Sequence, residues 1–215
     1  MTRETKKSKL QRAMFVHKQF LKRYPNPKCA LNYDDDPFKL LIAVMLSAQT
    51  TDKGVNLVTP KLWAKYPTPI ALASADIFEL EQIIKPIGTY KVKASNAISC
   101  AQLLVSDYGG VVPNNMDDLQ KFRGVGRKTA NVILTEYFGI SEGIAVDTHV
   151  FRIAKRLKFS LADSASACEQ DLLKLYPEQC WSRVNSCWVL FGREVCTAKK
   201  PKCEHCEIKE ICPSC

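Results

Sequence analysis

Four cysteines near the C-terminal end restrict the fold of this chain more than any other feature. Cys196, Cys203, Cys206 and Cys212 follow the spacing C-x6-C-x2-C-x5-C. Thiolates bind soft metals, and four of them in one tight loop supply a complete tetrahedral set of ligands. The spacing therefore predicts that this segment folds around a metal centre, and four unrelated cysteines are the weaker interpretation.

Two kinds of metal centre are compatible with these thiols. Cys212 and Cys215 form a further C-x2-C pair, so Cys203, Cys206, Cys212 and Cys215 could together hold zinc. The segment between the two pairs is shorter than the usual spacer of a zinc ribbon. We therefore favour an iron–sulfur cluster on the first four cysteines and keep zinc as the alternative.

Positive charge accompanies the cysteines. The loop between Cys196 and Cys203 contains Lys199, Lys200 and Lys202, and the whole chain has 31 Lys and Arg against 22 Asp and Glu, a net charge of +9. Such an excess indicates a polyanionic partner, with a basic surface of no special function as the alternative. A metal centre that shapes a lysine-rich loop would direct its charges at phosphates.

The remaining composition is that of an ordered protein outside the membrane. The chain has 215 residues, 46% of them hydrophobic and 25% charged, which is enough for a core. Its longest apolar run, residues 40–46, is too short to span a bilayer. Because the N-terminal segment has no signal-peptide pattern and leaves no room for an organelle presequence, we expect a prokaryotic cytoplasmic protein associated with the nucleoid.

The hydrophobic pattern predicts an all-α fold of about ten short helices, with only residues 144–147 briefly extended. Asp36 and Pro37 are a typical N-cap and first helical residue, Gly109 is a typical helix end, and Pro60 is expected to interrupt or kink its helix. Ser166 and Glu169 fit a capping box. The predicted helices cover residues 7–24, 38–48, 52–65, 75–84, 89–108, 116–122, 127–138, 148–157, 166–176 and 181–196.

The stretch FRGVGRKTANVIL, residues 122–134, predicts two helices joined by a tight turn. Gly124 and Gly126 would allow positive φ and the close approach of another backbone. The second helix begins at Arg127 and Lys128, and its N-terminal amides and dipole attract a phosphate. Such a helix-hairpin-helix contacts the DNA backbone and not the base sequence, although a GxG motif alone also fits an ordinary helix–helix loop.

Two titratable residues have both a structural and a chemical interpretation. Lys128 is by its position a phosphate contact, but the helix dipole and burial would both disfavour its ammonium form, and a neutral amine is a nucleophile. Asp147, in AVDTHVFR, is a favoured type of N-cap, or a carboxylate that works together with Lys128. His149 fits a structural residue beside that cap better than a general base.

Four segments together resemble the endonuclease III family of DNA base-excision glycosylases. They are LLIAVMLSAQTTD, GVGRKTANVIL, AVDTHVFR and the C-x6-C-x2-C-x5-C array, and they occur in the order and at the distances typical of that family. The resemblance extends from about Pro37 to Cys212. It implies a two-lobed helix-hairpin-helix glycosylase fold, with damaged double-stranded DNA as the partner of a monomeric protein.

The resemblance also implies a division into domains. Residues 30–141 would form a six-helix barrel that contains the hairpin at about residues 116–138. Residues 1–29 and 142–215 would form a discontinuous helical domain that carries a 4Fe–4S cluster in the loop 196–212. DNA would bind across the cleft, and the damaged base would be flipped out of the stack to expose its sugar.

The resemblance assigns roles to individual residues. Lys128 would attack C1′ of a nucleotide with an oxidised pyrimidine, expel the base and leave a Schiff base, after which β-elimination cuts the strand on the 3′ side. Asp147 would stabilise positive charge at the sugar and assist proton transfer. Cys196, Cys203, Cys206 and Cys212 would ligate the cluster, which has no part in the chemical step. Expected DNA contacts are Gln49, which fills the gap left by the flipped base, and Gly124, Val125, Gly126, Arg127, Thr129, Lys199 and Lys200.

Two positions depart from the family pattern. Arg123 stands where the family often has the proline of LPGVG, which adds a candidate phosphate contact. Thr89 stands where the family often has a leucine that wedges into the duplex. Because threonine wedges less well, the mode of strand separation and the preferred opposite base stay open.

Two other functions compete with this interpretation. The first is a close relative that removes mismatched adenine or thymine. Adenine-mismatch relatives have a longer C-terminal domain, and monofunctional relatives usually lack the lysine found at position 128. From a different class, a non-catalytic DNA-binding or redox-sensing module could carry the same metal loop. Only the pair Lys128 and Asp147 argues against that module.

Overall fold

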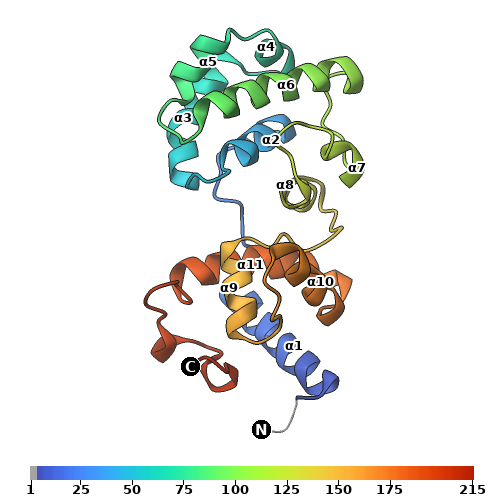
Figure 1. The fold of residues 1–215 in the computed structure, drawn as a ribbon, viewed down its shortest axis with the longest axis vertical. Coiled ribbons are helices and arrows are strands. Elements are labelled where there is room, and N and C mark those ends of the chain that lie inside the picture. Colours follow the sequence, from blue (N-terminus) through green and yellow to red (C-terminus); the bar gives the residue numbers. More distant parts are fainter. Residues whose placement is uncertain (1–3) are drawn as a thin grey trace. The chain divides into compact units, whose positions relative to one another are not determined.

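Helices make up all the regular structure of residues 4–215, which are the residues described by the computed structural model (Figure 1). This part of the chain has eleven α-helices, several short 3₁₀ turns and no strand. The all-α prediction is confirmed. Residues 144–147, which were expected to be extended, belong to an irregular, largely buried segment ahead of a helix.

The chain forms two compact units. The continuous unit, Ala30–Ile140, contains α2 (Pro37–Leu46), α3 (Asp52–Lys65), α4 (Pro69–Ala73), α5 (Ile77–Ile84), α6 (Tyr90–Tyr108), α7 (Met116–Leu119), α8 (Arg127–Ile133) and a π-helix, Leu134–Phe138. The discontinuous unit joins the N-terminal segment up to Cys29 with Ser141–Cys215. It contains α1 (Lys6–Arg23), α9 (Thr148–Arg156), α10 (Ala165–Leu175), α11 (Trp181–Glu194) and three 3₁₀ turns, Glu178–Cys180, Cys203–His205 and Lys209–Ile211.

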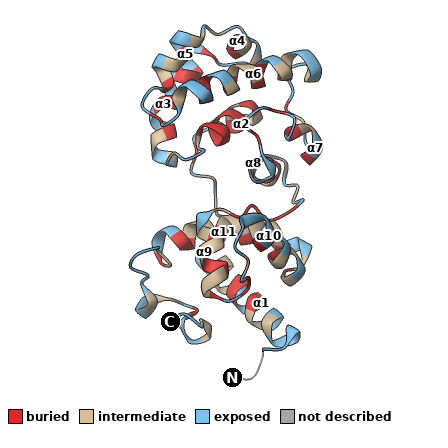
Figure 2. Cartoon of the chain, viewed as in Figure 1, coloured by how far each residue is buried: buried red, intermediate tan, exposed pale blue. Residues whose placement is uncertain are grey.

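Helix α2 is the buried centre of the continuous unit. As predicted, Asp36 caps it by accepting hydrogen bonds from the amides of Phe38 and Lys39, and Pro37 is its first residue. Every residue of α2 except Pro37 and Lys39 is buried (Figure 2). Helices α3, α6 and α8 pack around it. A helix that is apolar on all sides has to lie inside its unit, so this one fixes the position of the hairpin helix α8.

Several predicted helix boundaries were wrong. The short α4, which begins at Pro69 behind the N-cap Thr68, was not predicted. Helix α3 has the predicted bounds, but Pro60 does not interrupt it; this proline lies at an exposed position, where water can replace the missing main-chain hydrogen bond. The cap of α10 is Ser164, which accepts from the amide of Ala167, and not Ser166. The predicted helix 116–122 ends at Leu119.

Aromatic side chains hold the discontinuous unit together. Phe20 of α1 packs on Phe191 of α11, with ring centroids 4.1 Å apart, and on Trp188 at 6.1 Å. Trp188 also contacts Tyr176, whose hydroxyl donates a hydrogen bond to the buried carbonyl of Ala13. The N-terminal helix is therefore an integral part of a core that is otherwise built from the C-terminal third of the chain.

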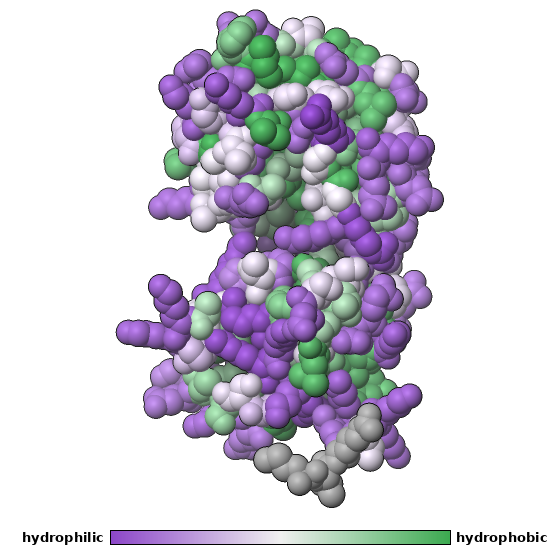
Figure 3. Space-filling model, in the orientation of Figure 1, coloured by the Kyte–Doolittle hydropathy of each residue, from purple (hydrophilic) through white to green (hydrophobic). Residues whose placement is uncertain are grey.

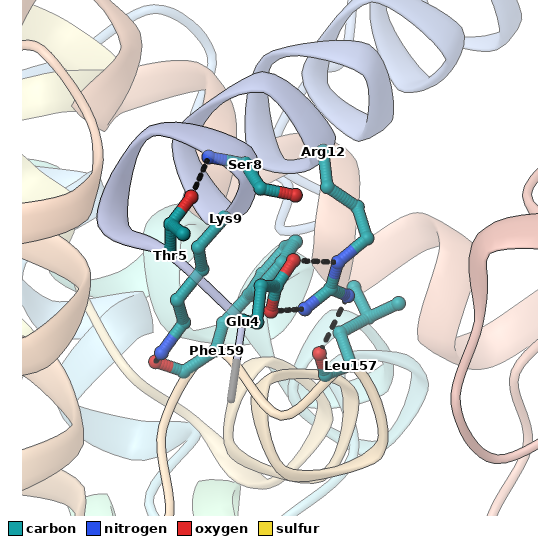
Figure 4. A network of polar contacts seen from close by, with 7 residues as sticks. All are labelled: Glu4, Thr5, Ser8, Lys9, Arg12, Leu157 and Phe159. Atoms are coloured by element: carbon teal, nitrogen blue, oxygen red, sulfur yellow. Dashed lines mark hydrogen bonds and ion pairs between the residues drawn. The ribbon is translucent and has the colours of Figure 1, made fainter. Parts of the chain in front are cut away.

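Polar contacts attach α1 to the end of α9 (Figure 4). The guanidinium of Arg12 donates to both carboxylate oxygens of Glu4, donates to the carbonyl of Leu157 at 2.7 Å, and stacks over the ring of Phe159. Lys9 donates to the carbonyl of Phe159 at 2.9 Å. These bonds satisfy the carbonyls of Leu157 and Phe159, in the segment that directly follows α9.

Polar side chains cover much of the surface. The face drawn in Figure 3 is mostly hydrophilic, with small apolar patches among the polar side chains. Among the helices of residues 4–215, none is both long enough and apolar enough to span a bilayer.

Candidate functional site

The hairpin between α7 and α8 depends on one glycine. Gly124 has φ +87°, and a Cβ placed there would lie 2.9 Å from the side-chain nitrogen of Asn96 and 3.1 Å from the sulfur of Met45. Both the backbone conformation and the packing therefore require glycine. Gly126 differs from this expectation: its φ is −93°, and a Cβ there would have no neighbour within 4 Å. The space beside Gly126 is open.

The turn is anchored from inside the unit. Phe122 is buried and packs on Tyr108 with ring centroids 5.4 Å apart. Val125 is also buried, and its amide donates to the carbonyl of Phe122 at 3.0 Å. Since the side chain and the amide of Val125 are both occupied, the predicted DNA contact at this position would have to use other main-chain atoms.

Helix α8 presents its first residues to solvent. Its N-cap is Gly126, and no side chain caps the helix. Arg127 and Lys128 are exposed, and Thr129 is half-buried. Lys128 is therefore not buried within the continuous unit, although the sequence had left that open. Its amine is accessible at the positive end of a helix dipole.

Gln49 lies in a strained loop. It is an exposed non-glycine residue with φ +54°, between α2 and α3. Thr89, just before α6, is likewise exposed and has φ +55°. Left-handed conformations cost energy for residues with a Cβ, and they concentrate at functional sites. The two positions that the family resemblance assigned to the interior of the duplex are therefore both held in left-handed backbone.

Lys93 connects these two loops, and sequence analysis missed it. Its side chain is only 4% exposed. Its ammonium donates to Oγ1 of Thr50, next to Gln49, at 2.7 Å, and its amide donates to the carbonyl of Thr89 at 3.1 Å. Burial lowers the pKa of Lys93. The side chain of Lys93 thus ties the loop that carries Gln49 to the start of α6, which directly follows Thr89.

Asp147 caps α9 in the discontinuous unit. One oxygen of its carboxylate, Oδ1, accepts from the amides of His149 and Val150, each at 2.8 Å. These bonds fix the half-buried side chain and leave Oδ2 on the opposite side of the carboxylate. His149 contacts the guanidinium of Arg152 and lies against Gly192, where a Cβ would come within 2.7 Å of the His149 Cβ. This packing agrees with the structural role expected for His149.

Two arginines of α9 hold the start of the cysteine loop. Arg152 donates to the carbonyls of Gly192 and Cys196, both at 2.9 Å. Arg156, four residues later on the same face, donates to the sulfur of Cys196 at 3.1 Å and to the carbonyls of Thr197 and Ala198. Neither residue was predicted from the sequence. Their spacing of four in THVFRIAKRL was the available signal, because it places both on one side of a helix.

The four predicted ligands line one small cavity. Cys196, Cys203, Cys206 and Cys212 surround a space of about 40 Å³ together with apolar side chains that include Ile153, Leu157, Val195 and Ile208. Burial raises the pKa of Cys206, and the neighbouring Cys212 and Cys196 add to this effect. A thiol with a raised pKa needs a cation nearby to ionise. The donor set and the apolar wall fit an iron–sulfur cluster.

Within residues 4–215, no three His, Cys, Asp or Glu side chains stand in the arrangement of ligands around one metal ion. In a four-iron cluster each thiolate binds its own iron, so the sulfurs stand around a shared centre.

The lysines of the cysteine loop point outward. Lys199 and Lys200 are exposed at its tip. Below them the loop is closed by two hydrogen bonds, from the Thr197 hydroxyl to the carbonyl of Lys200 at 2.7 Å and from the Lys202 amide to the carbonyl of Val195 at 2.9 Å. A short closed loop with exposed cations is suited to contact a phosphate backbone.

Comparison with family models gives two matches. Residues 42–178 match the HhH-GPD superfamily of base excision DNA repair proteins. Residues 196–212 match the iron–sulfur binding domain of endonuclease III. The second segment begins and ends at the first and last cysteine of the predicted ligand set.

Known proteins and structures agree with these matches. The chain is 42% identical to endonuclease III of Synechocystis sp. over 96% of its length and 94% of that protein, and 41% identical to endonuclease III of Escherichia coli over 87% and 88%. It superimposes on the structure of a trapped endonuclease III–DNA covalent intermediate with a TM-score of 0.90 and 41% identity, covering 99% of this chain and 97% of the other.

Proposed function

This chain belongs to the endonuclease III family of base excision repair enzymes, DNA glycosylases that also cut at abasic sites, and we propose that it removes oxidised pyrimidines from duplex DNA and cuts the strand 3′ to the abasic site. The proposed barrel, residues 30–141, supplies the hairpin and the nucleophile. The proposed cluster domain, residues 1–29 and 142–215, supplies the second catalytic carboxylate. The protein would act as a monomer on chromosomal DNA in a prokaryotic cytoplasm.

The position of Lys128 carries the proposal. Its exposed amine stands in the first turn of α8, directly behind a turn that tolerates no side chain at Gly124. Only a neutral amine is a nucleophile, so the ammonium has to release a proton before attack. The amine nitrogen would bond to C1′ of the damaged nucleotide as the bond from C1′ to the base breaks. The covalent intermediate trapped with a 41% identical relative supports this covalent course.

Strand cleavage would follow from the resulting imine. Loss of a proton from C2′ and departure of the 3′ phosphate break the C3′–O bond, so the strand is cut without water as the attacking group. Asp147 supports these steps through its charge. Because Oδ1 is fixed by two amides, Oδ2 can be held toward the positive charge that develops at the sugar.

The remaining residues would bind and position DNA. The open space at Gly126 would allow a phosphate to approach the turn, with Arg127 and Thr129 beside it. Gln49 and Thr89 would occupy the duplex where the flipped base has left, and the strained loops that carry them are braced by Lys93. A bound iron–sulfur cluster would crosslink the cysteine loop. The exposed Lys199 and Lys200 of this loop would then contact the DNA backbone.

Borohydride trapping tests the proposal. The substrate is a duplex with one oxidised pyrimidine, and the proteins are wild type, Lys128→Gln and the control Lys61→Gln, which removes an exposed lysine of α3. We expect a covalent adduct with wild type and Lys61→Gln and none with Lys128→Gln. Base release without an adduct in wild type would mean a monofunctional enzyme in which Lys128 only binds phosphate. Binding without base release would favour the non-catalytic DNA-binding module.

A further inference from the structure

A buried lysine links two exposed segments of the continuous unit. Lys93 lies in the first turn of α6 and is only 4% exposed. Its ammonium donates a hydrogen bond to Oγ1 of Thr50 at 2.7 Å, and the two residues are 43 positions apart in the sequence. An ammonium that is enclosed in this way is not available to a phosphate of DNA. Its charge therefore serves a contact inside the protein.

Thr50 is fixed by its side chain and by its main chain. The hydroxyl accepts from Lys93, and the methyl group lies against the first turn of α3, where a Cβ on Gly54 would come within 3.2 Å of it. The amide of Thr50 donates to the carbonyl of Ser47 at 3.0 Å, which closes the turn that contains Gln49. The backbone on the C-terminal side of Gln49 is thus held in one position.

Gln49 needs this support because it is exposed and has φ +54°. A left-handed conformation costs energy for a residue with a Cβ and persists only where the surrounding structure enforces it. The direction of an exposed side chain is set by its backbone, since little packs against it. If Thr50 were released, Gln49 could relax to a common conformation and turn its side chain elsewhere.

The segment that ends in Thr89 lies at the other end of this link. Thr89 is exposed, has φ +55° and directly precedes α6. Its carbonyl accepts from the amide of Lys93 at 3.1 Å, as is usual in the first turn of a helix. The side-chain bond from Lys93 to Thr50 therefore fixes the loop of Gln49 relative to the start of α6, where Thr89 stands.

We propose that Lys93 is a positioning residue for base extrusion, which acts through Thr50 to hold Gln49 in the conformation in which it enters the duplex beside Thr89. The inference rests on the proposed function, which places Gln49 and Thr89 where the flipped base has left. A loop that is ordered before binding does not have to be ordered during it, so more of the free energy of contact is left to separate the bases. Lys93 itself contacts neither DNA nor the reacting sugar.

Base release under single-turnover conditions tests the proposal. The substrate is a duplex with one oxidised pyrimidine, and all proteins are assayed at a temperature where circular dichroism shows them folded. They are wild type, Lys93→Met, Gln49→Ala, the double variant and the control Lys61→Met, which removes an exposed lysine of α3. Lys93→Met should release the base about tenfold more slowly than wild type and Lys61→Met, because a small misplacement of a positioning group slows the reaction strongly. In the Gln49→Ala background, Lys93→Met should have little further effect.

A matched pair of variants tests the same bond from its other end. Thr50→Ser keeps the hydroxyl that accepts from Lys93, whereas Thr50→Val keeps the shape of the side chain and removes the acceptor. Thr50→Ser should release the base at close to the wild-type rate, and Thr50→Val should be as slow as Lys93→Met. This pair decides the case if Lys93→Met does not fold.

The salt dependence of DNA affinity separates positioning from direct contact. Loss of a lysine that contacts a phosphate lowers the slope of log affinity against log salt concentration by about 1. Lys93→Met should keep the slope of wild type, because its ammonium is buried.

Three results would overturn the inference while wild type releases base. In the first, folded Lys93→Met releases base at the wild-type rate, or Thr50→Ser and Thr50→Val release it equally fast. In the second, Lys93→Met slows release by the same factor with and without Gln49, so that it acts elsewhere. In the third, the salt slope of Lys93→Met is lower by about 1, which makes Lys93 a phosphate contact. A wild type that releases no base would instead overturn the proposed function, and the inference with it.

Discussion

The ammonium of Lys93 lies 2.7 Å from Oγ1 of Thr50, and this bond joins the first turn of α6 to the loop that carries Gln49. A buried ammonium without a partner is costly, so the hydroxyl of Thr50 matters more to the fold than an exposed threonine would. The bond links two loops whose exposed residues, Gln49 and Thr89, both have positive φ.

Thr50→Val should therefore destabilise the protein by about 1–3 kcal/mol, because it leaves the Lys93 ammonium unsatisfied. Lys93→Met should cost less, since it removes the charge together with its need for a partner. In the Lys93→Met background, Thr50→Val should have a smaller effect than in wild type. Denaturant unfolding of the four proteins in a double-mutant cycle measures this, and strictly additive effects would mean that the two side chains are not coupled.

The two glycines of the hairpin should respond differently to alanine. Gly124→Ala should lower the free energy of unfolding by about 1–3 kcal/mol, because a non-glycine residue is strained at φ +87°. Gly126→Ala has an ordinary φ and open space, so its stability should stay within about 0.5 kcal/mol of wild type. Its affinity for an abasic-site duplex should nevertheless fall, as measured by fluorescence anisotropy. Unchanged affinity would show that DNA does not approach Gly126.

Asp147 should have separable structural and catalytic effects. Asparagine also caps helices, so Asp147→Asn should unfold like wild type, whereas Asp147→Ala should lose about 0.5–2 kcal/mol. Both variants should slow base release under single-turnover conditions by about a hundredfold, because both remove the negative charge. A variant Asp147→Asn with normal base release would restrict Asp147 to its capping role.

His17 should make stability depend on pH. Burial, aided by the charge of Arg183, lowers the pKa of His17 below its usual 6.5. Between the lowered value and 6.5, the unfolded chain binds more protons than the folded one, so the free energy of unfolding falls as the pH falls through this window. His17→Gln should show a shallower fall than wild type or His205→Gln, an exposed control. Equal slopes in all three proteins would contradict the prediction.

Local chemistry made part of this structure predictable. Asp36 with Pro37, and Gly109 after α6, mark helix ends through interactions with their immediate neighbours, and the structure has them as the sequence indicated. The glycine turn and the cysteine spacing could likewise be predicted from the sequence, because each is contained in a short segment.

Contacts between distant segments could not be predicted in this way. The partner of Lys93 lies 43 residues away, and the carbonyl of Cys196 lies 44 residues from Arg152. The difference between Gly124 and Gly126 depends on Met45 and Asn96, which no local pattern brings near the turn. Pattern and capping rules describe one helix at a time, whereas these features arise only when helices pack.

Helix α9 connects the proposed catalytic carboxylate to the cysteine loop. It carries Asp147 at its N-terminal end, and from its last turn Arg156 holds the sulfur and the neighbouring carbonyls of the cysteine loop. These bonds make one helix the shared support of the carboxylate and of the cysteine loop. We therefore expect a chain that lacks the four cysteines to need another partner for Arg156 if Asp147 is to keep its place. The AVDTH segment and the cysteine loop are in this sense one mechanical unit, although only one of them takes part in the proposed chemistry.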